Sequence, residues 1–580
     1  MIKRIFTAMA VALPMAFIAS CEKPQQEQVE PVVATYYLTA DETEVIELAD
    51  QRSKDVRLNV KAVETVGSEA NLTFALRADA SLIEAYNEAN ATDCIALPGD
   101  CYSFATKEVT ISRYGVNSTT ALLTVTANNL EIGKNYLLPV TIAEVKGGDY
   151  HLTEAPECYI KVCASLGGSV QVDLTGLRDD ACLPADASKT PDLVIKTADD
   201  MMKIPEILVN GQTKYVVLDA DIDMAGKSWT PINTGEGYSK GLEFNGQGHT
   251  IRNFTCTSGS YRSFYGIMNG RMYDVTFEDA IIDGTADGGT QPCAVIAGYG
   301  GNKQGMCEAI IYDVHVVRGS VKGYKAVGVG GLVGVAVNTI VKRSSADVEI
   351  VNTNGRRSGG LVGYHNCTHD GAFLRIEDSW SAGSIFGTQN IGGIIGQTQF
   401  ENGKNAYSVA ASLIRNCYST MTVTALRNVG GIASGCSYGG SYATTELEIP
   451  KDIVMNCIAW NDKLEAQETA KGNYSSGAIV GYCNIYQYFI DCFRKPDLDF
   501  SCPIAELGIE VTLLDQDNTS PELSLFTGTK ADATCPYVYE HAYPYHGKAA
   551  GEGVTVSALA KALGWDESVW DLSEDLPVLK

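Results

Sequence analysis

The chain has 580 residues, of which 45% are hydrophobic, and its 70 acidic and 44 basic side chains give a formal net charge of −26. The hydrophobic fraction is ample for a folded core and argues against global disorder. The acidic excess, with no cluster of Lys and Arg, argues against a nucleic-acid partner, because phosphate contacts need grouped basic side chains. The length predicts three or four domains, or fewer if one of them is a long repeat.

Residues 1–21 have the pattern of an export signal, in which Lys3 and Arg4 precede an apolar run. The run closes on Ile-Ala-Ser-Cys at Cys21, which resembles a bacterial lipobox. That resemblance implies a lipoprotein signal peptide with the lipid attached to Cys21. Residues 22–31 are rich in Gln, Glu and Pro and are predicted to be a flexible tether. The acidic residues of this tether resemble the surface-export signal of Bacteroidetes-type lipoproteins, which implies an outer-membrane location facing the cell exterior.

Alternating hydrophobic and polar residues predict an immunoglobulin-like β-sandwich over residues 32–163. Seven or so short strands are expected, with one short helix over Ser81–Ala89. The clearest strand patterns are Asp55–Val60, Leu72–Leu76, Thr119–Val125 and Tyr136–Ile142.

The order Tyr86-Asn87, Leu97-Pro98, Tyr102 and Asn135–Val140 resembles a sandwich domain of unknown function. This domain stands at the N-terminus of many glycan-handling surface lipoproteins. The resemblance implies a spacer or platform and supplies no catalytic residue.

After a predicted linker over residues 164–192, a glycine motif recurs through residues 193–505. Its copies are Gly330–Gly334, Gly359–Tyr364, Gly392–Gly396, Gly430–Ser434 and Ser476–Tyr482, with looser forms at Tyr265–Asn269 and Cys293–Gly298. The steps between copies vary from 28 to 47 residues. A regular motif at irregular spacing indicates one structural unit repeated, with the surplus residues in loops.

A second motif follows each copy and pairs a polar residue with a small one. It reads Tyr273-Asp274, Tyr312-Asp313, Arg343-Ser344, Asp378-Ser379, Asn416-Cys417, Asn456-Cys457 and Asp491-Cys492. Two short strands per unit, one of them apolar and flanked by glycine, predict a parallel β-helix in which the stack itself is the core. Cys417, Cys457 and Cys492 are expected to stack inward as small hydrophobic residues, and the recurring aspartates to serve turns rather than catalysis.

The combination of G-G-L-V-G and N-C motifs resembles the GLUG repeat of bacterial surface proteins, some of which are immunoglobulin-cleaving metalloproteases. The segments Leu218–Met224, Trp229–Ile232 and Phe244–Ile251 resemble the usual opening of such solenoids. The resemblance implies a right-handed parallel β-helix over roughly residues 193–500, and it says almost nothing about function.

No motif in the sequence indicates a metal, a cofactor or a catalytic centre. His365 and His369 are interpreted as an exposed loop, because no HExxH pattern is present. The alternating Asp219, Asp221 and Asp223 are interpreted as the polar face of a strand, since the glycine and glutamate of a calcium loop are missing. Among the 17 cysteines, the pairs Cys94 with Cys101 and Cys158 with Cys163 are close enough in sequence to bridge.

Residues 506–580 are predicted to form a C-terminal cap. One helix is predicted before the solenoid, over Thr197–Leu208, with Thr197 as its N-cap. A second helix is predicted within the cap, over Val556–Leu563, with Thr555 as its N-cap. This second helix, with Trp565 and Trp570, is expected to cover the solenoid end. The candidate ligand-binding residues are Tyr537, Tyr539, Tyr543, Tyr545 and His546, near His541, because aromatic rings with polar groups suit sugars. The alternative is that these tyrosines pack the cap onto the last coil.

The sequence therefore predicts an all-β protein: a β-sandwich, a right-handed parallel β-helix and a small α/irregular cap. The predicted function is a non-catalytic cell-surface lipoprotein that binds glycans or glycoconjugates for uptake or adhesion, tied to the membrane only by its lipid. Two alternatives remain: an adhesin that binds host protein, and a β-helical polysaccharide lyase or hydrolase.

Overall fold

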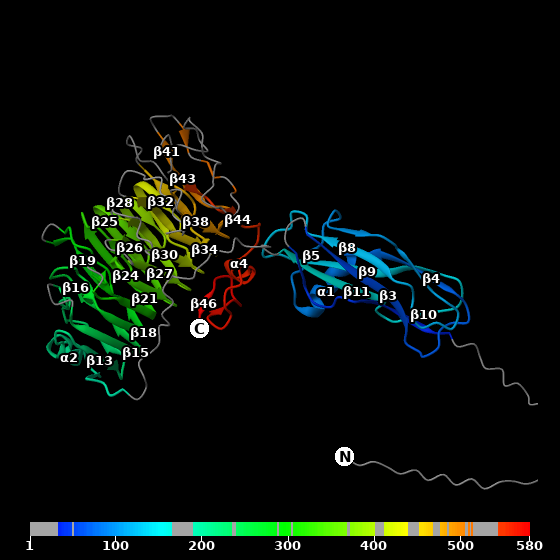
Figure 1. The fold of residues 1–580 in the computed structure, drawn as a ribbon, viewed down its shortest axis with the longest axis horizontal. Helices are drawn as coiled ribbons and strands as arrows, with labels where there is room; N and C mark the ends of the chain where they lie inside the picture. The colour runs from blue at the N-terminus through cyan, green and yellow to red at the C-terminus, as the bar shows by residue number, and fades with distance from the viewer. Residues whose placement is uncertain are drawn as a thin grey trace, which may run out of the picture.

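The computed structural model describes residues 33–580 apart from several gaps. The gaps are 49–51, 165–188, 235–238, 287–288, 303–305, 368–371, 401–410, 439–451, 468–475, 484–486, 505–508, 511, 514 and 516–542. The chain is predominantly β, with a two-sheet N-terminal part and a larger part built of parallel ladders (Figure 1).

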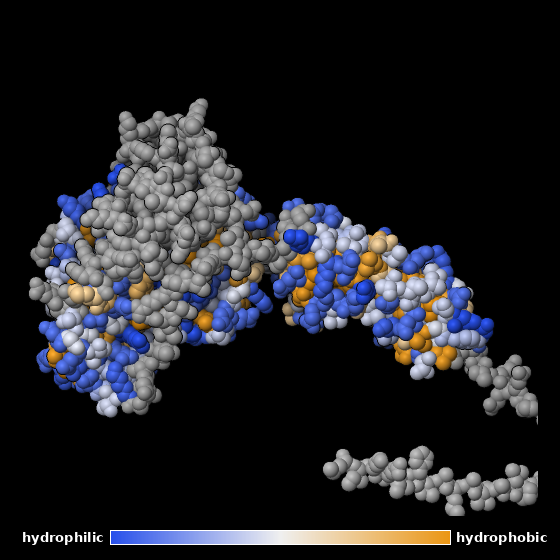
Figure 2. Space-filling model, viewed as in Figure 1, coloured by the Kyte–Doolittle hydropathy of each residue, from blue (hydrophilic) through white to orange (hydrophobic). Residues whose placement is uncertain are grey.

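The N-terminal part is a sandwich of two sheets. One sheet has the order β10 (His151–Leu152), β1 (Thr35–Ala40), β3 (Ser53–Ala62), β8 (Ala121–Thr126), β6 (Tyr102–Phe104). The other has the order β2 (Ile46–Leu48), β11 (Glu157–Ala164), β9 (Asn135–Lys146), β4 (Leu72–Ala78), β7 (Glu108–Ile111), with β5 (Ile95–Ala96) also paired to β9. Alternate residues of each strand face the shared core, whereas the face in view in Figure 2 mixes hydrophilic and hydrophobic residues. The predicted helix is present as η1 (Ala80–Leu82) followed by α1 (Ile83–Asn90).

The larger part, here called the stacked domain, consists of a 23-stranded and an 8-stranded sheet. In the 23-stranded sheet the strands pair in parallel with equivalents one unit later, for example β24 with β27 and β27 with β30. Its members are β12 (Leu193–Ile195), β13 (Thr213–Leu218), β14 (Ile222–Asp223), β15 (Gly241–Arg252), β16 (Thr255–Cys256), β18 (Gly270–Glu278), β19 (Ile281–Gly284), β21 (Ala309–Tyr324), β22 (Val329–Gly330), β24 (Asn338–Lys342), β25 (Ser345–Gly359), β27 (Phe373–Glu377), β28 (Trp380–Gly392), β30 (Ala411–Arg415), β31 (Tyr418–Ser419), β32 (Thr422–Gly430), β34 (Asp452–Met455), β35 (Ile458–Ala459), β36 (Lys463–Ala466), β38 (Gln487–Ile490), β39 (Phe493–Arg494), β40 (Asp499–Ser501) and β44 (Lys548–Ala549).

The 8-stranded sheet takes one strand from each unit. Its order is β17 (Tyr265–Met268), β20 (Ala297–Gly300), β23 (Val333–Ala336), β26 (Val362–Cys367), β29 (Ile395–Phe400), β33 (Ala433–Tyr438), β37 (Val480–Cys483), β43 (Tyr543–Tyr545). All pairs are parallel except the last, in which β43 runs antiparallel to β37. One continuous hydrophobic core lies between the sheets, because no single unit can bury its apolar side chains alone.

The repeated glycines form the corner that joins the two sheets. A Cβ on Gly331, Gly360, Gly393 or Gly431 would lie 2.0–2.3 Å from a backbone carbonyl oxygen of the next unit. Since real Cβ atoms do not approach oxygen so closely, only glycine lets successive units stack at this corner. The apolar residue that follows points into the core, where Leu361 is fully buried.

The polar residue of the second motif forms another corner. Asp378, Asn416, Asn456 and Asp491 all have φ between 48° and 53°, the left-handed region that Asn and Asp tolerate best among residues with a side chain. Their side chains also bond along the stack, since the Asn416 amide donates to Asp378 Oδ1 at 3.1 Å. The recurring aspartates are therefore turn residues, as predicted.

The cysteines after these corners are buried, which confirms the inward position predicted for them. Cys417, Cys457 and Cys492 are at most 2% exposed, and burial raises the pKa of the Cys457 and Cys492 thiols well above the usual value. The two short-range pairs that could bridge, Cys94 with Cys101 and Cys158 with Cys163, are free thiols.

Two predicted helix starts are confirmed. The Thr197 hydroxyl accepts a hydrogen bond from the Asp200 amide at the start of α2 (Ala198–Met201), and Pro205 falls in the first turn of a separate α3 (Ile204–Ile207). The Thr555 hydroxyl caps α4 (Val556–Ala562) by accepting from the Ala558 amide at 3.1 Å. The remaining elements are two short antiparallel pairs, β41 (Pro503–Ile504) with β42 (Ile509–Glu510) and β45 (Trp570–Asp571) with β46 (Val578–Leu579).

Helix α4 and the two tryptophans of the C-terminal segment cover the flank of the stacked domain, and not its end as the sequence suggested. Trp380, Tyr418, Ile458 and Phe493 are aligned by strand pairing and form a column of side chains outside the main core. Helix α4, Trp565 and Trp570 pack on this column, and both tryptophans are buried, as expected of core residues. The physical reason is that this outward apolar column needs a cover. At the end itself, β43 and β44 pair with the last unit.

Candidate functional site

A groove of about 950 Å³ lies where the C-terminal segment meets the flank of the stacked domain. Its walls come from turns that follow β31, β35 and β39 and from the residues around the start of α4. We call it the flank groove; its lining residues are Thr420, Trp460, Asp462, Lys495, Pro496, Asp497, Glu552, Gly553, Val554, Thr555, Val556, Asp575 and Leu576.

Three of the lining residues occupy equivalent positions in successive units. The backbone amides of Thr420, Trp460 and Lys495 donate to Ser381, Ser419 and Ala459 of the preceding unit at 3.0, 2.8 and 2.9 Å. The stack therefore fixes the spacing of these three side chains along the groove. Strand scaffolds hold such positions more rigidly than isolated loops do.

The groove combines an aromatic ring with apolar surface. Trp460 is half-buried and packs against the hydrophobic cluster under α4. Val554 and Val556 are buried, while Leu576 keeps 40% of its surface exposed. An indole partly open to solvent, set beside apolar side chains, is suited to the C–H face of a sugar ring.

The rim of the groove is acidic. Asp462, Asp497, Glu552 and Asp575 line it with a single base, Lys495. Lys495 Nζ lies 2.6 Å from an Asp462 oxygen and 3.4 Å from an Asp497 oxygen. The hydrogen bond to Asp462, opposed by desolvation, raises the pKa of Lys495. Hydrogen-bond acceptors thus outnumber charged donors, which favours a ligand rich in hydroxyl groups over an anion.

A loop of the sandwich lies against the segment that lines the groove. A Cβ on Gly133 would come within 2.8 Å of Val554, and one on Gly551 within 1.9 Å of the Glu131 carboxylate. Lys134, paired with Glu131 at 2.8 Å, also interacts with Glu552 of the rim. The sandwich therefore borders the groove, which adds a contact role to the spacer role predicted for it.

The structure describes the side chains of two residues of the predicted aromatic ligand site, and both are buried. Tyr537 and Tyr539 lie outside the described residues, as does His541, and of Tyr543 only the backbone is described, in β43. Tyr545 is 1% exposed, with its ring stacked on Phe489 at 4.7 Å. His546 is fully buried, accepts from the Ala478 amide at 3.3 Å and has its pKa lowered to about 3 by burial. For these two residues the expectation is corrected, because they fill the last unit of the core.

The histidine loop is corrected in the same way. His365 belongs to β26, is fully buried and contacts the Cys367 sulfur at 3.4 Å, so it is not exposed. His369 lies outside the described residues, as does Cys21. The described part of the chain brings no three His, Cys, Asp or Glu residues together in a group that could hold a metal ion. Within those same residues, no helix has the length and apolar character needed to cross a membrane.

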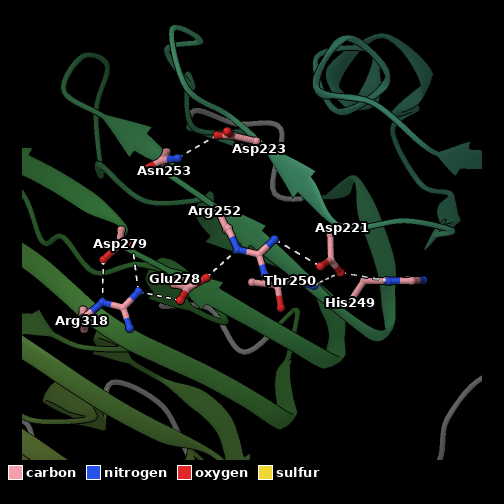
Figure 3. A network of polar contacts seen from close by, with 9 residues as sticks. All are labelled: Asp221, Asp223, His249, Thr250, Arg252, Asn253, Glu278, Asp279 and Arg318. Carbon is pink, nitrogen blue, oxygen red and sulfur yellow. Dashed lines mark hydrogen bonds and ion pairs between the residues drawn. The ribbon is translucent and has the colours of Figure 1, made fainter.

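Asp221 and Asp223 belong to a polar ladder near the first units (Figure 3). Of the three alternating aspartates only Asp223 lies in a strand, β14, so the expected polar strand face is not formed by Asp219 and Asp221. Asp221 accepts from the Thr250 amide at 3.1 Å and from Arg252 at 3.2 Å, and the backbone bond is the main cause that lowers its pKa. Arg252 also contacts Glu278, which in turn pairs with Arg318. Asp221, Glu278 and Asp279 each pair with an arginine, and Asp223 accepts from the Asn253 side-chain amide at 2.8 Å, so the ladder serves the stacking of units.

One row of side chains has the composition of a hydrolytic triad. His315 Nδ1 lies 2.9 Å from Ser345 Oγ, and His315 Nε2 lies 3.1 Å from Asp313 Oδ1. Ser345 is only 2% exposed and lines neither the flank groove nor the smaller groove beside Gly270. A nucleophile must reach its substrate, and the buried Ser345 cannot. The row is therefore another polar ladder.

The flank groove was missed from the sequence. Its residues come from five separate segments, and no motif connects them. The available signal was Trp460, a large aromatic residue at a position where the neighbouring units carry Thr420 and Lys495.

One family model matches the N-terminal part of the chain. A family model described as a "-like, N-terminal domain" matches residues 25–149, which include β1 to β9. No curated protein matches the sequence.

Several solved structures from Bacteroides resemble parts of the chain. A candidate immunoglobulin A1 protease from Bacteroides ovatus is 20% identical over 67% of this chain and 91% of its own, with a TM-score of 0.42. EndoBT-3987 from Bacteroides thetaiotamicron is 20% identical over 30% of this chain and 40% of its own, with a TM-score of 0.19. A candidate carbohydrate binding protein from Bacteroides ovatus is 14% identical over 22% of this chain and 36% of its own, with a TM-score of 0.18. These identities and TM-scores are low, and no activity is transferred from them.

Proposed function

We propose that this protein is a lipid-anchored, outer-surface protein that binds neutral glycans in the flank groove without catalysis. In this proposal Cys21 carries the lipid, and the stacked domain is a right-handed parallel β-helix of GLUG type. The observation that carries the binding proposal is the half-buried Trp460 set among carboxylates in a groove of about 950 Å³.

The charge of the rim supports a neutral ligand. Four carboxylates and one lysine surround the ring, and an approaching uronate or sulfate would meet net repulsion. Sugar hydroxyls, by contrast, can donate to Asp462 and Asp497, whose side chains are 79% and 74% exposed. The groove volume falls in the range of small-ligand sites, about 300–1,000 Å³, and suits a short oligosaccharide.

The test is binding of neutral and anionic oligosaccharides to residues 22–580, by array and then by calorimetry, with Trp460→Ala as the variant. If Trp460 supplies the stacking surface, its loss should cost about 2 kcal/mol, or roughly thirtyfold in Kd. Trp380→Ala is the matched control, since Trp380 also packs against the cluster under α4 but does not line the groove.

Each outcome separates the proposal from its rivals. Neutral-glycan binding that Trp460→Ala weakens and Trp380→Ala leaves intact supports the flank groove. Equal losses in both variants would mean that the packing of α4, and not the ring, governs binding. Binding of host protein without any glycan would favour the adhesin, and release of shorter sugars from a polysaccharide would favour the enzyme.

A further inference from the structure

One end of the sandwich carries an exposed apolar patch. Val63, Val66, Tyr114 and Tyr150 are 60%, 51%, 48% and 37% exposed, and we call them the tip patch. They stand on three loops, and Figure 2 shows hydrophobic surface at the end of the sandwich where Figure 1 places β10.

Hydrogen bonds hold the three loops together. The Gly67 amide donates to the Tyr114 carbonyl at 3.3 Å, and the Tyr114 amide donates to the Ser68 carbonyl at 2.8 Å. The Ser68 hydroxyl donates to the Asp149 carbonyl at 3.4 Å, which brings in the loop of Tyr150. The patch is therefore one preformed surface.

The chain enters the sandwich at this same end. The Val63 amide donates to the Thr35 carbonyl at 2.8 Å, and the His151 amide donates to the Ala34 carbonyl at 3.0 Å. Residues 22–32, between Cys21 and this point, span at most about 40 Å when fully extended. A lipid on Cys21 would keep the entry end of the sandwich within that distance of the bilayer.

We propose that the tip patch docks on the surface of the bilayer that holds the lipid anchor; this inference rests on the proposed attachment at Cys21. Valine side chains on loops can enter the acyl boundary, and tyrosine prefers the interface between lipid and water. Arg113, whose guanidinium lies 4.6 Å from the Tyr114 ring centre, can meet lipid phosphates.

The charges around the patch set what kind of lipid it needs. Arg113 and Lys146 are exposed, and so are Glu69 and Asp149. Because the two signs balance, attraction to anionic lipid is not the driving force, and docking depends on the apolar side chains. The patch adds a second membrane contact at the same end of the sandwich as the lipid.

The experiment uses the full lipidated chain in vesicles of phosphatidylcholine and phosphatidylethanolamine, followed by hydrogen exchange. Docking predicts slower amide exchange, by about tenfold, in residues 63–68 and 112–115 than in the unlipidated chain. The exposed turn at Gly99 and Asp100 serves as an internal control, and its amides should exchange equally in both. A Val66→Asp, Tyr114→Ser variant should keep its lipid and melting temperature but lose the protection.

The results distinguish the two proposals. Protein that floats with vesicles but exchanges freely at the tip would overturn docking and leave the anchor standing. Protein that does not float at all would overturn the anchor and, with it, this inference. Protection that survives in the variant would show that the shielding has another cause.

Discussion

The stacking corner allows a direct test of the architecture through Gly360. A Cβ at this position would lie 2.0 Å from the Gly393 carbonyl oxygen, 2.5 Å from Met421 Sδ and 2.6 Å from Ser381 Cβ. The nearest atom is backbone and cannot rotate away. Relief would need a displacement of about 1 Å between two stacked units, and that displacement would stretch the bond from the Gly360 amide to the same carbonyl.

The magnitude follows from two opposing effects. Inserting a side-chain atom into a fully packed region lowers the free energy of unfolding by about 1–3 kcal/mol. We place a clash with backbone at the upper end of that range, because the backbone atom cannot rotate away. Alanine recovers about 0.4–1 kcal/mol because it restricts the unfolded chain. We therefore expect Gly360→Ala to lower the free energy of unfolding of the stacked domain by about 2 kcal/mol, which corresponds to a fall of about 3 °C in its melting temperature.

The assay is differential scanning calorimetry of the whole chain, with the sandwich transition as an internal reference. Gly387→Ala, in β28, is the matched control, because its two nearest contacts are with the end of the Ile391 side chain, which can move. Its expected cost is below about 1 kcal/mol. Equal melting temperatures for Gly360→Ala and the wild type would refute the reasoning that carbonyl proximity demands glycine at this corner.

Two further predictions concern the C-terminal part. The pKa of His546 is lowered from 6.5 to about 3 in the folded chain, so the unfolded chain takes up the proton first as pH falls. Its contribution to stability is complete above about pH 6.5 and declines toward pH 3. Between pH 7 and 4.5, the free energy of unfolding measured with urea should fall less for His546→Asn than for the wild type. Equal falls in the two proteins would contradict burial of the neutral ring. Thr555→Ala should destabilise α4 by about 1 kcal/mol through loss of its N-cap, whereas Thr555→Ser should not, as measured by exchange of the α4 amides.

Local rules made much of the fold predictable. The alternation in strands such as β3 follows from the period of two, and its Val56, Leu58 and Val60 face the sandwich core. The left-handed corner at Asn416 follows from the low cost of that conformation for Asn. Each of these features depends on residues close together in the chain.

The candidate site could not be predicted because it depends on which surfaces meet. The sequence pattern of an amphipathic helix such as α4 predicts that one face will be buried, but it does not identify the surface on which that face packs. Its partner column combines Tyr418, Ile458 and Phe493, which are separated by whole units and become neighbours only after stacking. For the same reason the pattern around Tyr545 could not distinguish a sugar platform from core packing.

The C-terminal segment also determines how the stacked domain can come apart. An array whose units touch only their neighbours can fray from one end, unit by unit. Here α4 packs across the column from Tyr418 to Phe493. The Tyr418 hydroxyl also donates to the Pro577 carbonyl at 2.9 Å. Arg343 donates to the Lys580 carbonyl, which is 237 residues away in the sequence. Fraying of the last units must first detach this segment, which joins several local steps into one cooperative event. Mechanical pulling from the C-terminus should accordingly show one large rupture before any series of small ones.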